Sequence, residues 1–449
     1  MNRRRLILAV GVVGVGGASG VVAAACGPAG GAGTEAPKAT AERVTIEHYN
    51  FFDPEALERM KPVWEKFHQA QPNVRVEHLP AEGNEANKRE KMQALVAGGT
   101  PPAVLGQIIA QYPSYYALPG LIEPLDALVT GDKIDKKLFS ATPYETFAYK
   151  GVQYALPYGA SMELIAYNKE LFAKQGIKEP PKTWDDPSWT LGEFLTRAQA
   201  LTKAPAGGTP EQFGLQRSGP QWNAWPLVWG TDWVDTTLAR FQGTQQAVID
   251  ALQARQDFVW RQHVAPQPTE TGMFGSLSSS QRFLGGQVAM ADMGTWNLPA
   301  WIKGAKFGWD VAPWYRGGTG AAAGSIYPVG EAIGKGTKHK QQAWQLVKFL
   351  TYKADANLDY AFLKGAAPAL TANLTPWRAM LTKEMPGITA QIPADLIGRF
   401  GKVGRLHFVA KYDDISRLIA PVVTDVEANK VAAKAALEQV TPQVQQLLG

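Results

Sequence analysis

The spacing of apolar and polar positions over residues 44–105 changes several times, and each change predicts a new element. Residues 44–50 (VTIEHYN) alternate and carry β-branched and aromatic side chains, which is typical of a strand. After Pro54, apolar residues recur every three or four positions, which predicts a helix that Pro62 kinks or restarts. The expected elements are strands Val44–Asn50, Val74–Leu79 and Ala103–Leu105, with helices after Pro54 and over Asn87–Ala97. This series predicts a parallel sheet with ligand sites at the carboxyl ends of its strands.

The pattern begins again after a boundary near Pro157. Residues 149–157 (YKGVQYALP) predict a hairpin turn and a strand that ends at the proline. A long helix is expected from Thr190, because Thr190 and Glu193 have the spacing of a capping box. The other expected elements are strand Glu163–Tyr167 and helices Asn168–Gln175, Gln245–Gln262, Ser278–Leu284, Gln341–Thr351, Ala354–Leu363 and Val431–Leu448. We therefore expect two α/β lobes.

Residues 1–25 have the order of features of a bacterial export signal. Arg3–Arg5 give a basic start, an apolar, Gly-rich run follows from Leu6, and three alanines precede Cys26. This order resembles a lipoprotein signal, in which cleavage before the cysteine frees its thiol for lipid attachment, although such signals usually carry leucine where this chain has Ala23. We therefore expect cleavage before Cys26 and lipidation of its thiol. Sec and twin-arginine export stay equally open.

The tract behind Cys26 is the second sign of an anchor. Gly27–Ala41 is rich in Gly, Ala, Pro and Thr, which predicts a flexible tether. The alternative is an uncleaved transmembrane helix over residues 6–25, because about 20 apolar residues suffice to span a bilayer. Beyond residue 41 no apolar run approaches about 18 residues, so we expect the rest of the chain to fold in water.

Composition excludes several classes of protein. A single cysteine among 449 residues rules out an internal disulfide, a cysteine zinc site and an iron–sulfur cluster. The formal charge of +5 reflects 45 Lys+Arg against 40 Asp+Glu, and without Arg3–Arg5 it falls to 42 against 40. Since no dense basic run follows residue 25, we expect no nucleic-acid partner.

Sequence motifs of common enzymes are absent. The chain has no G-x-S-x-G and no H-E-x-x-H, and residues 330–336 (GEAIGKG) lack the spacing and hydroxyl of a phosphate loop. The acidic pairs Asp232/Asp235 and Asp413/Asp414 are expected to be solvated loop charges. Because glycosidase carboxylates meet only in the fold, a secreted carbohydrate-active enzyme stays open as an alternative.

Tryptophan is concentrated in one part of the chain: nine of the fourteen lie between residues 222 and 314. Core packing is the default interpretation of such a stripe. Flat aromatic faces also stack on the apolar faces of sugar rings, and the indole N–H can donate a hydrogen bond. We therefore expect at least one of these tryptophans to contact a ligand.

Five blocks of sequence, in this order, resemble the family 1 extracellular solute-binding proteins of ABC transporters, the maltose- and multiple-sugar-binding type. The blocks lie at residues 44–105 (with MQALVAGGTPPAV at 92–104), 154–172 (YALPY and IAYNKELF), 180–184 (PPKTW), 283–296 (FLGGQVAMADMGTW) and 330–350, ending AWQLVKFL. The resemblance implies a two-lobed fold of the type II periplasmic-binding-protein class, each lobe a mostly parallel sheet flanked by helices. It also implies a ligand cleft between the lobes, hinge closure, no catalysis, no cofactor and no metal.

The resemblance also suggests which residues contact the ligand. Trp296 takes the place of the family's stacking tryptophan, with Asp292 just before it. The other candidates follow strands or lie on the crossover: Phe51, Phe52, Gln107, Tyr112, Tyr158, Trp222, Trp225, Trp229, Tyr327 and Arg405.

Together these observations predict a lipoprotein that is anchored through Cys26 outside the cytoplasm, captures a carbohydrate and delivers it to an ABC permease. The resemblance implies that it acts as a monomer. The alternatives are a non-sugar solute, such as a glycerol phosphate or a polyamine, or a carbohydrate-active enzyme. The predicted segments are a signal peptide at 1–25, a tether at 26–41, the first lobe at 42–156 with a return segment at 313–365, and the second lobe at 157–312 and 366–449 with the C-terminal helices.

Overall fold

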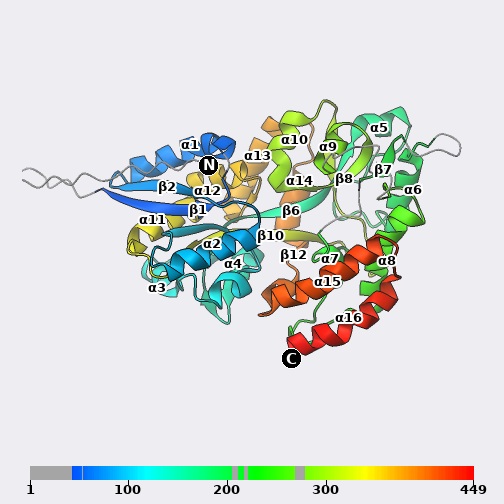
Figure 1. Cartoon of the computed structure of the whole chain (residues 1–449). Helices are drawn as coiled ribbons and strands as arrows, with labels where there is room; N and C mark the ends of the chain where they lie inside the picture. Colours follow the sequence, from blue (N-terminus) through cyan, green and yellow to red (C-terminus); the bar gives the residue numbers. More distant parts are fainter. Residues whose placement is uncertain (1–42, 53, 205–210, 217–220, 268–278) are drawn as a thin grey trace, which may run out of the picture. The chain divides into compact units, whose positions relative to one another are not determined.

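The computed structural model describes residues 43–52, 54–204, 211–216, 221–267 and 279–449. Arg43–Gly449 form one compact unit (Figure 1). The predicted signal peptide, the tether and Cys26 lie outside the described residues. In the part of the chain that is described, no helix is both long and apolar enough to cross a membrane.

The first half of the sheet is the parallel arrangement that the sequence predicts. Strand β1 (Val44–Asn50) pairs in parallel with β2 (Val74–Pro80) on one side and with β3 (Val104–Ile108) on the other. Helices α1 (Pro54–Ala70) and α2 (Glu85–Ala97) connect these strands. The carboxyl ends of β1 and β3 therefore lie at one edge of the sheet, as the βαβ series requires.

Helix α1 continues through Pro62 and does not restart there. Pro62 and Glu58, whose carbonyl loses its helical partner to the proline, are both exposed. Water can therefore satisfy that carbonyl, so the proline does not end the helix.

Two long strands join the halves of the sheet. Strands β6 (Leu156–Asn168) and β10 (Gly324–Ile333) pair antiparallel, and β10 also pairs with β3. All thirteen residues of β6 are buried. Toward its end, β6 pairs antiparallel with β8 (Val288–Gly294) and β9 (Trp309–Ala312), whereas β7 (Phe213–Leu215) is parallel to β8. The mostly parallel sheet expected for each lobe is thus found in the first half, while antiparallel pairs with β6 dominate the second.

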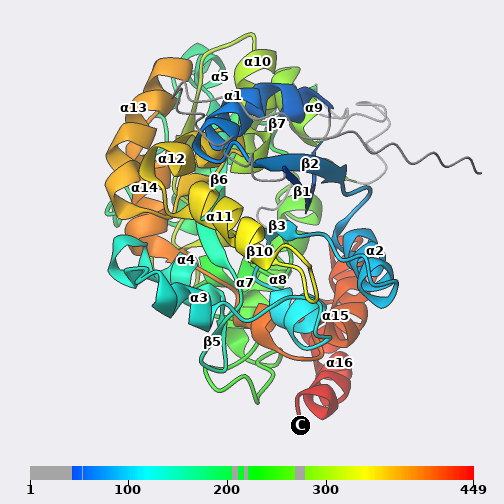
Figure 2. The ribbon, with the colours of Figure 1, turned by 90° about the vertical axis from the view of Figure 1, so that its left-hand side faces the viewer.

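Separate apolar cores pack against the two halves of the sheet. In the first half, α11 (Lys340–Thr351) and α12 (Ala354–Leu363) bury residues against α1 and the strands, and α1 and α12 lie side by side (Figure 2). A third core forms between α8 (Gln246–Trp260), α15 (Tyr412–Glu427) and α16 (Ala433–Leu448), which pack against one another. The cores account for most of the buried aromatic side chains.

The remaining elements are short or connect these layers. They are η1 (Pro113–Ala117), α3 (Asp126–Gly131), η2 (Lys136–Leu138), α4 (Ala141–Thr146), β4 (Ala148–Tyr149), β5 (Val152–Gln153), α5 (Lys169–Lys174), α6 (Leu191–Leu201), α7 (Trp225–Val228), α9 (Ser279–Leu284), η4 (Thr295–Asn297), α10 (Leu298–Gly304), β11 (Ala367–Pro368), η5 (Thr371–Asn373), α13 (Leu374–Glu384), α14 (Gln391–Asp395), η6 (Leu396–Phe400), β12 (Gly401–Lys402) and η7 (Arg405–Phe408). The expected hairpin is β4–β5.

Candidate functional site

A cavity of about 390 Å³ opens where the carboxyl ends of β1 and β3 meet the joining strands β6 and β10. The first half contributes side chains from α1, α2 and the end of α12, and the second half contributes η4 and α10. The volume lies within the range of about 300–1,000 Å³ that is usual for small-molecule sites. The lining residues are Phe51, Ala56, Arg59, Met60, Glu85, Gln107, Ile109, Gln111, Tyr158, Ser161, Gln221, Trp296, Pro299, Tyr327, Val329, Leu363 and Lys364.

Trp296 presents an uncovered aromatic ring to this cavity. Its side chain lies on η4 and is 41% exposed, which is unusual for so large an apolar group. The Tyr327 ring lies edge-on to it, with the ring centroids 5.8 Å apart. The indole lies over Gly294, where an added Cβ would come within 2.1 Å of it. Glycine at 294 therefore leaves room for the ring in this position.

A buried carboxyl group stands behind Tyr327. Glu163 of β6 accepts hydrogen bonds from the Tyr327 hydroxyl at 2.8 Å, and from the Ser325 hydroxyl and the Gln221 backbone N–H, both at 3.3 Å. Burial raises the pKa of Glu163 to about 7, and nearby Asp292 raises it further, while the three hydrogen bonds act in the opposite direction. Glu163 therefore positions two lining residues, Tyr327 and Gln221, and is partly protonated at neutral pH.

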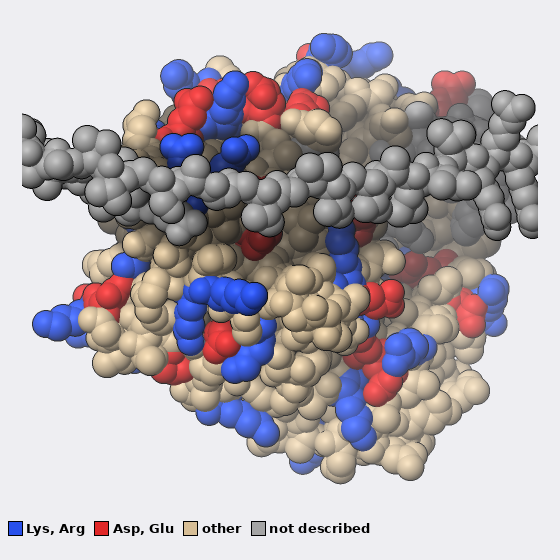
Figure 3. Space-filling view, turned by 60° about the vertical axis from the view of Figure 1, so that its left-hand side comes forward, with Lys and Arg blue, Asp and Glu red and all other residues tan. Residues whose placement is uncertain are grey.

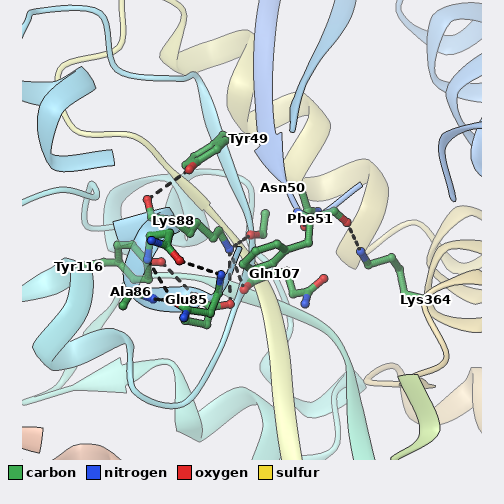
Figure 4. A network of polar contacts seen from close by, with 12 residues as sticks. Tyr49, Asn50, Phe51, Glu85, Ala86, Lys88, Gln107, Tyr116 and Lys364 are labelled. Atoms are coloured by element: carbon green, nitrogen blue, oxygen red, sulfur yellow. Dashed lines mark hydrogen bonds and ion pairs between the residues drawn. The ribbon is translucent and has the colours of Figure 1, made fainter. Parts of the chain in front are cut away.

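The opposite wall is built around a buried lysine, shown in Figure 4. The Lys88 side chain is 0% exposed, and its ammonium donates to the carbonyl oxygens of Gly106 at 2.7 Å and Gln107 at 3.2 Å. It also lies 4.8 Å from the centroid of the Phe51 ring and 3.9 Å from a Glu85 carboxylate oxygen. Burial lowers the pKa of Lys88.

A second buried polar cluster lies beside Tyr158. His48 Nε2 is 2.9 Å from Glu331 Oε2, and the Tyr360 hydroxyl donates to the other Glu331 oxygen at 2.9 Å. Tyr360 packs edge-on against Tyr158, with centroids 4.8 Å apart. A Cβ at Gly106 would meet His48 Nε2 at 2.4 Å, so this glycine lets β3 pass close to the cluster. The cluster thus fixes the inner wall near Tyr158.

The structure brings five of the residues that the sequence suggested to the cavity lining: Phe51, Gln107, Tyr158, Trp296 and Tyr327. They come from segments that are far apart in the chain, so their meeting depends on the fold. Whether each of them contacts a ligand stays a prediction.

The other suggested tryptophans lie away from the lining. Trp225 and Trp229 are 1% and 3% exposed within the core of the second half, and Trp225 packs against Trp229. Trp222 packs edge-on against Trp233 in the core beside α15 and α16. The positions of these three tryptophans therefore agree with the core-packing interpretation of the stripe.

The remaining suggested residues hold structure near the cavity. Phe52 is buried against His48, and Tyr112 is fully buried. Asp292 is half-buried on β8 near Glu163, and Arg405 donates from Nε to the Val234 carbonyl at 2.8 Å. None of the four is part of the lining.

The sequence analysis missed six polar or charged lining residues and one buried carboxyl group behind them. The sequence does mark Glu163, because it is the one charged residue in the run LPYGASMELIAYN. A charged residue in a buried strand needs hydrogen-bonding partners. Arg59 and Glu85 look like ordinary helix-surface residues in the sequence, so no signal marked them. The lining residues that were missed are Arg59, Glu85, Gln111, Ser161, Gln221 and Lys364, with Glu163 behind them.

The acidic pairs are only partly the solvated loop charges that were expected. Asp232 is 3% exposed and accepts the Arg405 backbone N–H at 3.0 Å, and burial raises its pKa to about 6. That expectation is therefore wrong for Asp232, because its backbone partners permit burial. Asp413 pairs with Arg89, and neither acidic pair lines the cavity.

The described residues contain no group of three or more His, Cys, Asp or Glu side chains that could hold a metal ion. In the part of the face in Figure 3 that the grey atoms leave uncovered, basic and acidic side chains of the described residues are interspersed.

Residues 63–384 fit the sequence profile of the bacterial extracellular solute-binding proteins. Among characterised relatives, the maltotriose-binding protein of Pyrococcus abyssi is 25% identical over 274 residues, or 57% of this chain and 52% of the relative. The mannitol-binding protein of Pseudomonas aeruginosa is 29% identical over 35% of this chain and 34% of the relative. The sn-glycerol-3-phosphate-binding periplasmic protein UgpB of Salmonella paratyphi A is 24% identical over 69% of this chain and 70% of the relative. The chain thus spans about half the length of the first of these relatives.

Solved structures share the fold at lower identity. An ABC substrate-binding protein from Listeria monocytogenes in complex with cycloalternan superposes with a TM-score of 0.77, at 20% identity, over 91% of this chain and 100% of its own. UgpB from Mycobacterium tuberculosis in complex with glycerophosphocholine superposes with a TM-score of 0.75, at 17% identity, over 90% of this chain and 98% of its own. Maltose-bound MalE3 of T. maritima superposes with a TM-score of 0.71, at 22% identity, over 90% of this chain and 99% of its own. These likenesses show a two-lobed fold of mixed α/β type.

Proposed function

Because this chain belongs to the bacterial extracellular solute-binding proteins, we propose that it is the substrate-binding lipoprotein of an ABC importer, and that it captures a carbohydrate and delivers it to the membrane permease. The observation that carries the choice of carbohydrate is the exposed ring of Trp296, set edge-on to Tyr327 in a cavity between the two halves of the sheet. An oligosaccharide is the proposed ligand.

Neutral polar groups support a neutral, hydroxyl-rich ligand. Gln107, Gln111 and Gln221 line the cavity together with Ser161. Primary amides both donate and accept, so they suit sugar hydroxyls, which do the same. In the proposed complex the indole of Trp296 stacks on a sugar ring while the amides fix the hydroxyl directions.

Closure of the two lobes around the sugar belongs to the same proposal. Strands β6 and β10 run between the halves of the sheet, so we propose that bending occurs along them, with the lobes divided at residues 157, 313 and 366. Sugar binds the closed form more tightly and so raises its population. We also propose that Cys26 carries a lipid anchor outside the cytoplasm, and that the protein acts as a monomer.

A non-sugar solute is the second candidate, and a specific observation favours it. Arg59 and Lys364 both line the cavity, and two cations suit a phosphate ester. One relative described above is named for binding sn-glycerol 3-phosphate, and one structural neighbour contains glycerophosphocholine. Arg59 is already paired with Glu55 at 3.3 Å, however, which weakens its attraction for an anion.

The deciding experiment measures the thermal midpoint of the purified chain with a panel of ligands. The panel contains maltose, maltotriose, longer maltodextrins, mannitol, sn-glycerol 3-phosphate, glycerophosphocholine and a polyamine. A ligand present at about a thousand times its Kd stabilises the fold by about 4 kcal/mol, so a true ligand gives a clear rise in midpoint.

A rise with one oligosaccharide series supports the proposal and gives the preferred length. A rise only with a phosphate ester or a polyamine would replace the sugar by that solute. Release of reducing ends from the maltodextrins would instead identify the carbohydrate-active enzyme.

A further inference from the structure

Lys88 gathers cavity-lining groups from three separate segments. Its ammonium contacts the Phe51 ring that follows β1, the Gln107 carbonyl at the end of β3 and the Glu85 carboxylate one turn earlier on α2. Phe51, Gln107 and Glu85 all line the cavity, whereas Lys88 does not. Figure 4 shows these side chains around the ammonium.

The backbone at Gln107 is in an unfavourable conformation. Its φ is 52°, in the left-handed region that is unfavourable for a residue other than glycine. Directly opposite, the pairing of β10 with β3 shifts register between Gly330 and Ala332. A left-handed residue that is not glycine persists only where its surroundings hold it. The Lys88 ammonium donates to the carbonyl oxygens on both sides of this bend, those of Gly106 and Gln107.

A fully buried lysine is itself unusual. Taking an ammonium out of water is costly, so such a side chain is retained only with several partners. Lys88 has two carbonyls, one carboxylate and one aromatic face. If Lys88 only stabilised helix α2, it would not need contacts with groups that follow β1 and belong to β3.

We propose that Lys88 is the positioning residue of the binding cavity: its buried ammonium sets the left-handed bend that turns the Gln107 side chain into the cavity, and it holds Phe51 and Glu85 beside it. Lys88 does not touch the ligand. This inference rests on the proposed function, because it assigns Lys88 a part in forming the sugar-binding surface.

Affinity is the first test. Lys88→Met keeps the length of the side chain and removes the ammonium, so binding of maltotriose and the other panel sugars should weaken about tenfold or more, the value of one charge-assisted hydrogen bond. The matched control is Lys91→Met, the same substitution at an exposed position of the same helix, which should leave affinity within about twofold. A folded Lys88→Met protein that binds like the wild type overturns the proposal.

The bend at Gln107 gives a test that needs no ligand. Glycine adopts φ of 52° freely, so Gln107→Gly should reduce the loss of stability that Lys88→Met causes in urea denaturation. With Lys91→Met the two changes should simply add. Additivity with Lys88→Met would show that the lysine does not hold the bend, whether or not any sugar binds.

The wild-type protein supplies a measurement for the case in which Lys88→Met does not fold. Burial lowers the pKa of Lys88, so sugar affinity should fall as the pH rises toward the ordinary lysine value of 10.5, while circular dichroism shows the fold intact. The Glu85 and Glu331 carboxylates face the ammonium and act against the effect of burial on its pKa, and the pKa of neighbouring Tyr49 is raised to about 12. Burial also raises the pKa values of the lining residues Tyr158 and Tyr327.

A second lysine, Lys364, lines the cavity itself, so the measurement is repeated in Lys364→Met. A fall that persists in this variant supports the inference, and affinity that is flat up to unfolding contradicts it. If the wild type binds no sugar of the panel, the proposed function fails, and the Gln107→Gly experiment still decides the role of Lys88.

Discussion

Glu163 brings an ionisable group into a strand whose thirteen residues are all buried. Its folded-state pKa of about 7 lies above the ordinary value of 4.5, so folding favours the protonated form. The protonated carboxyl contributes its full stability below about pH 4.5, and this contribution is lost as the pH rises through about 7. Stability should therefore fall across this window.

Glu163→Gln tests this pH dependence, because glutamine cannot ionise and still accepts from the Tyr327 hydroxyl. Relative to the wild type, its free energy of unfolding should rise by on the order of 2–3 kcal/mol between about pH 5 and pH 8. Urea denaturation at both pH values measures the change. Glu65→Gln, at an exposed helix position, is the control. An equal difference at the two pH values would show that Glu163 does not titrate with folding.

Trp296 is the residue from which the choice of sugar was argued. Trp296→Ala should weaken sugar binding by about 1–3 kcal/mol, because a buried aromatic contact is lost in the complex. Since the free side chain is 41% exposed, the thermal midpoint without ligand should change little. Calorimetry with the best panel sugar measures the effect, and Trp296→Phe should retain part of the affinity. An unchanged Kd for Trp296→Ala would remove this residue from the site.

Residue by residue, the sequence could suggest aromatic lining groups but not polar ones. Trp296 and Tyr158 lie in recognisable blocks, so their places in the fold could be anticipated. Trp225 and Trp229 share their residue type and spacing with ligand-stacking groups, and only the folded structure shows that they are core. In the sequence Lys88 resembles an ordinary lysine on a helix surface. Its hydrogen-bond acceptors lie eighteen and nineteen residues further along the chain, so no local pattern shows that it is buried.

At the scale of elements, the start of α2 matters most for the cavity because Glu85 is its first residue. Asn84 caps this helix: its side chain accepts from the backbone N–H groups of Ala86 and Asn87, and the Asn87 side chain accepts from the Asn84 N–H. Asn84→Ala should lower the free energy of unfolding by about 1 kcal/mol. Chemical denaturation measures this loss, and Asn84→Asp, which retains the acceptor, should restore most of it. A full loss in Asn84→Asp would contradict the capping role.

The strands differ in how well the sequence predicts them. β1 was predicted with its observed bounds, because alternation and β-branched residues coincide there. β10 was missed, since Pro328 and Gly330 break the usual strand composition. The structure accommodates Pro328 where β10 pairs with β6 alone, between its contacts with β12 and β3. Such a gap in a neighbouring ladder is a tertiary property, so no local pattern reveals it.

At the scale of the molecule, an ion pair connects elements from opposite ends of the chain. Arg89 of α2 pairs with Asp413 of α15, and both side chains are largely buried, at 17% and 28% exposure. The Arg89 guanidinium also lies 4.6 Å from the centroid of the Tyr115 ring, which itself packs against Tyr412. Because the pair is partly shielded from water, it should be worth more than an exposed one.

A double-mutant cycle with Arg89→Met and Asp413→Asn measures this interaction. We expect a coupling free energy of about 1 kcal/mol in urea denaturation. The control cycle uses the exposed pair of Asp414 and Arg417 on α15, with Asp414→Asn and Arg417→Met, and should give a value near zero. Equal coupling in the two cycles would mean that the link between α2 and α15 adds nothing specific.

The joining of β6 to β10 also has a consequence for how the chain reaches its native state. Ile326 lies opposite Met162, 164 residues earlier, so the centre of the sheet closes late in synthesis. Until then β3 and β6 each present an unpaired edge, which is prone to association with other chains. Contacts of such long range slow folding. We therefore expect slow refolding, limited by the arrival of β10, and aggregation of any fragment that ends before residue 324.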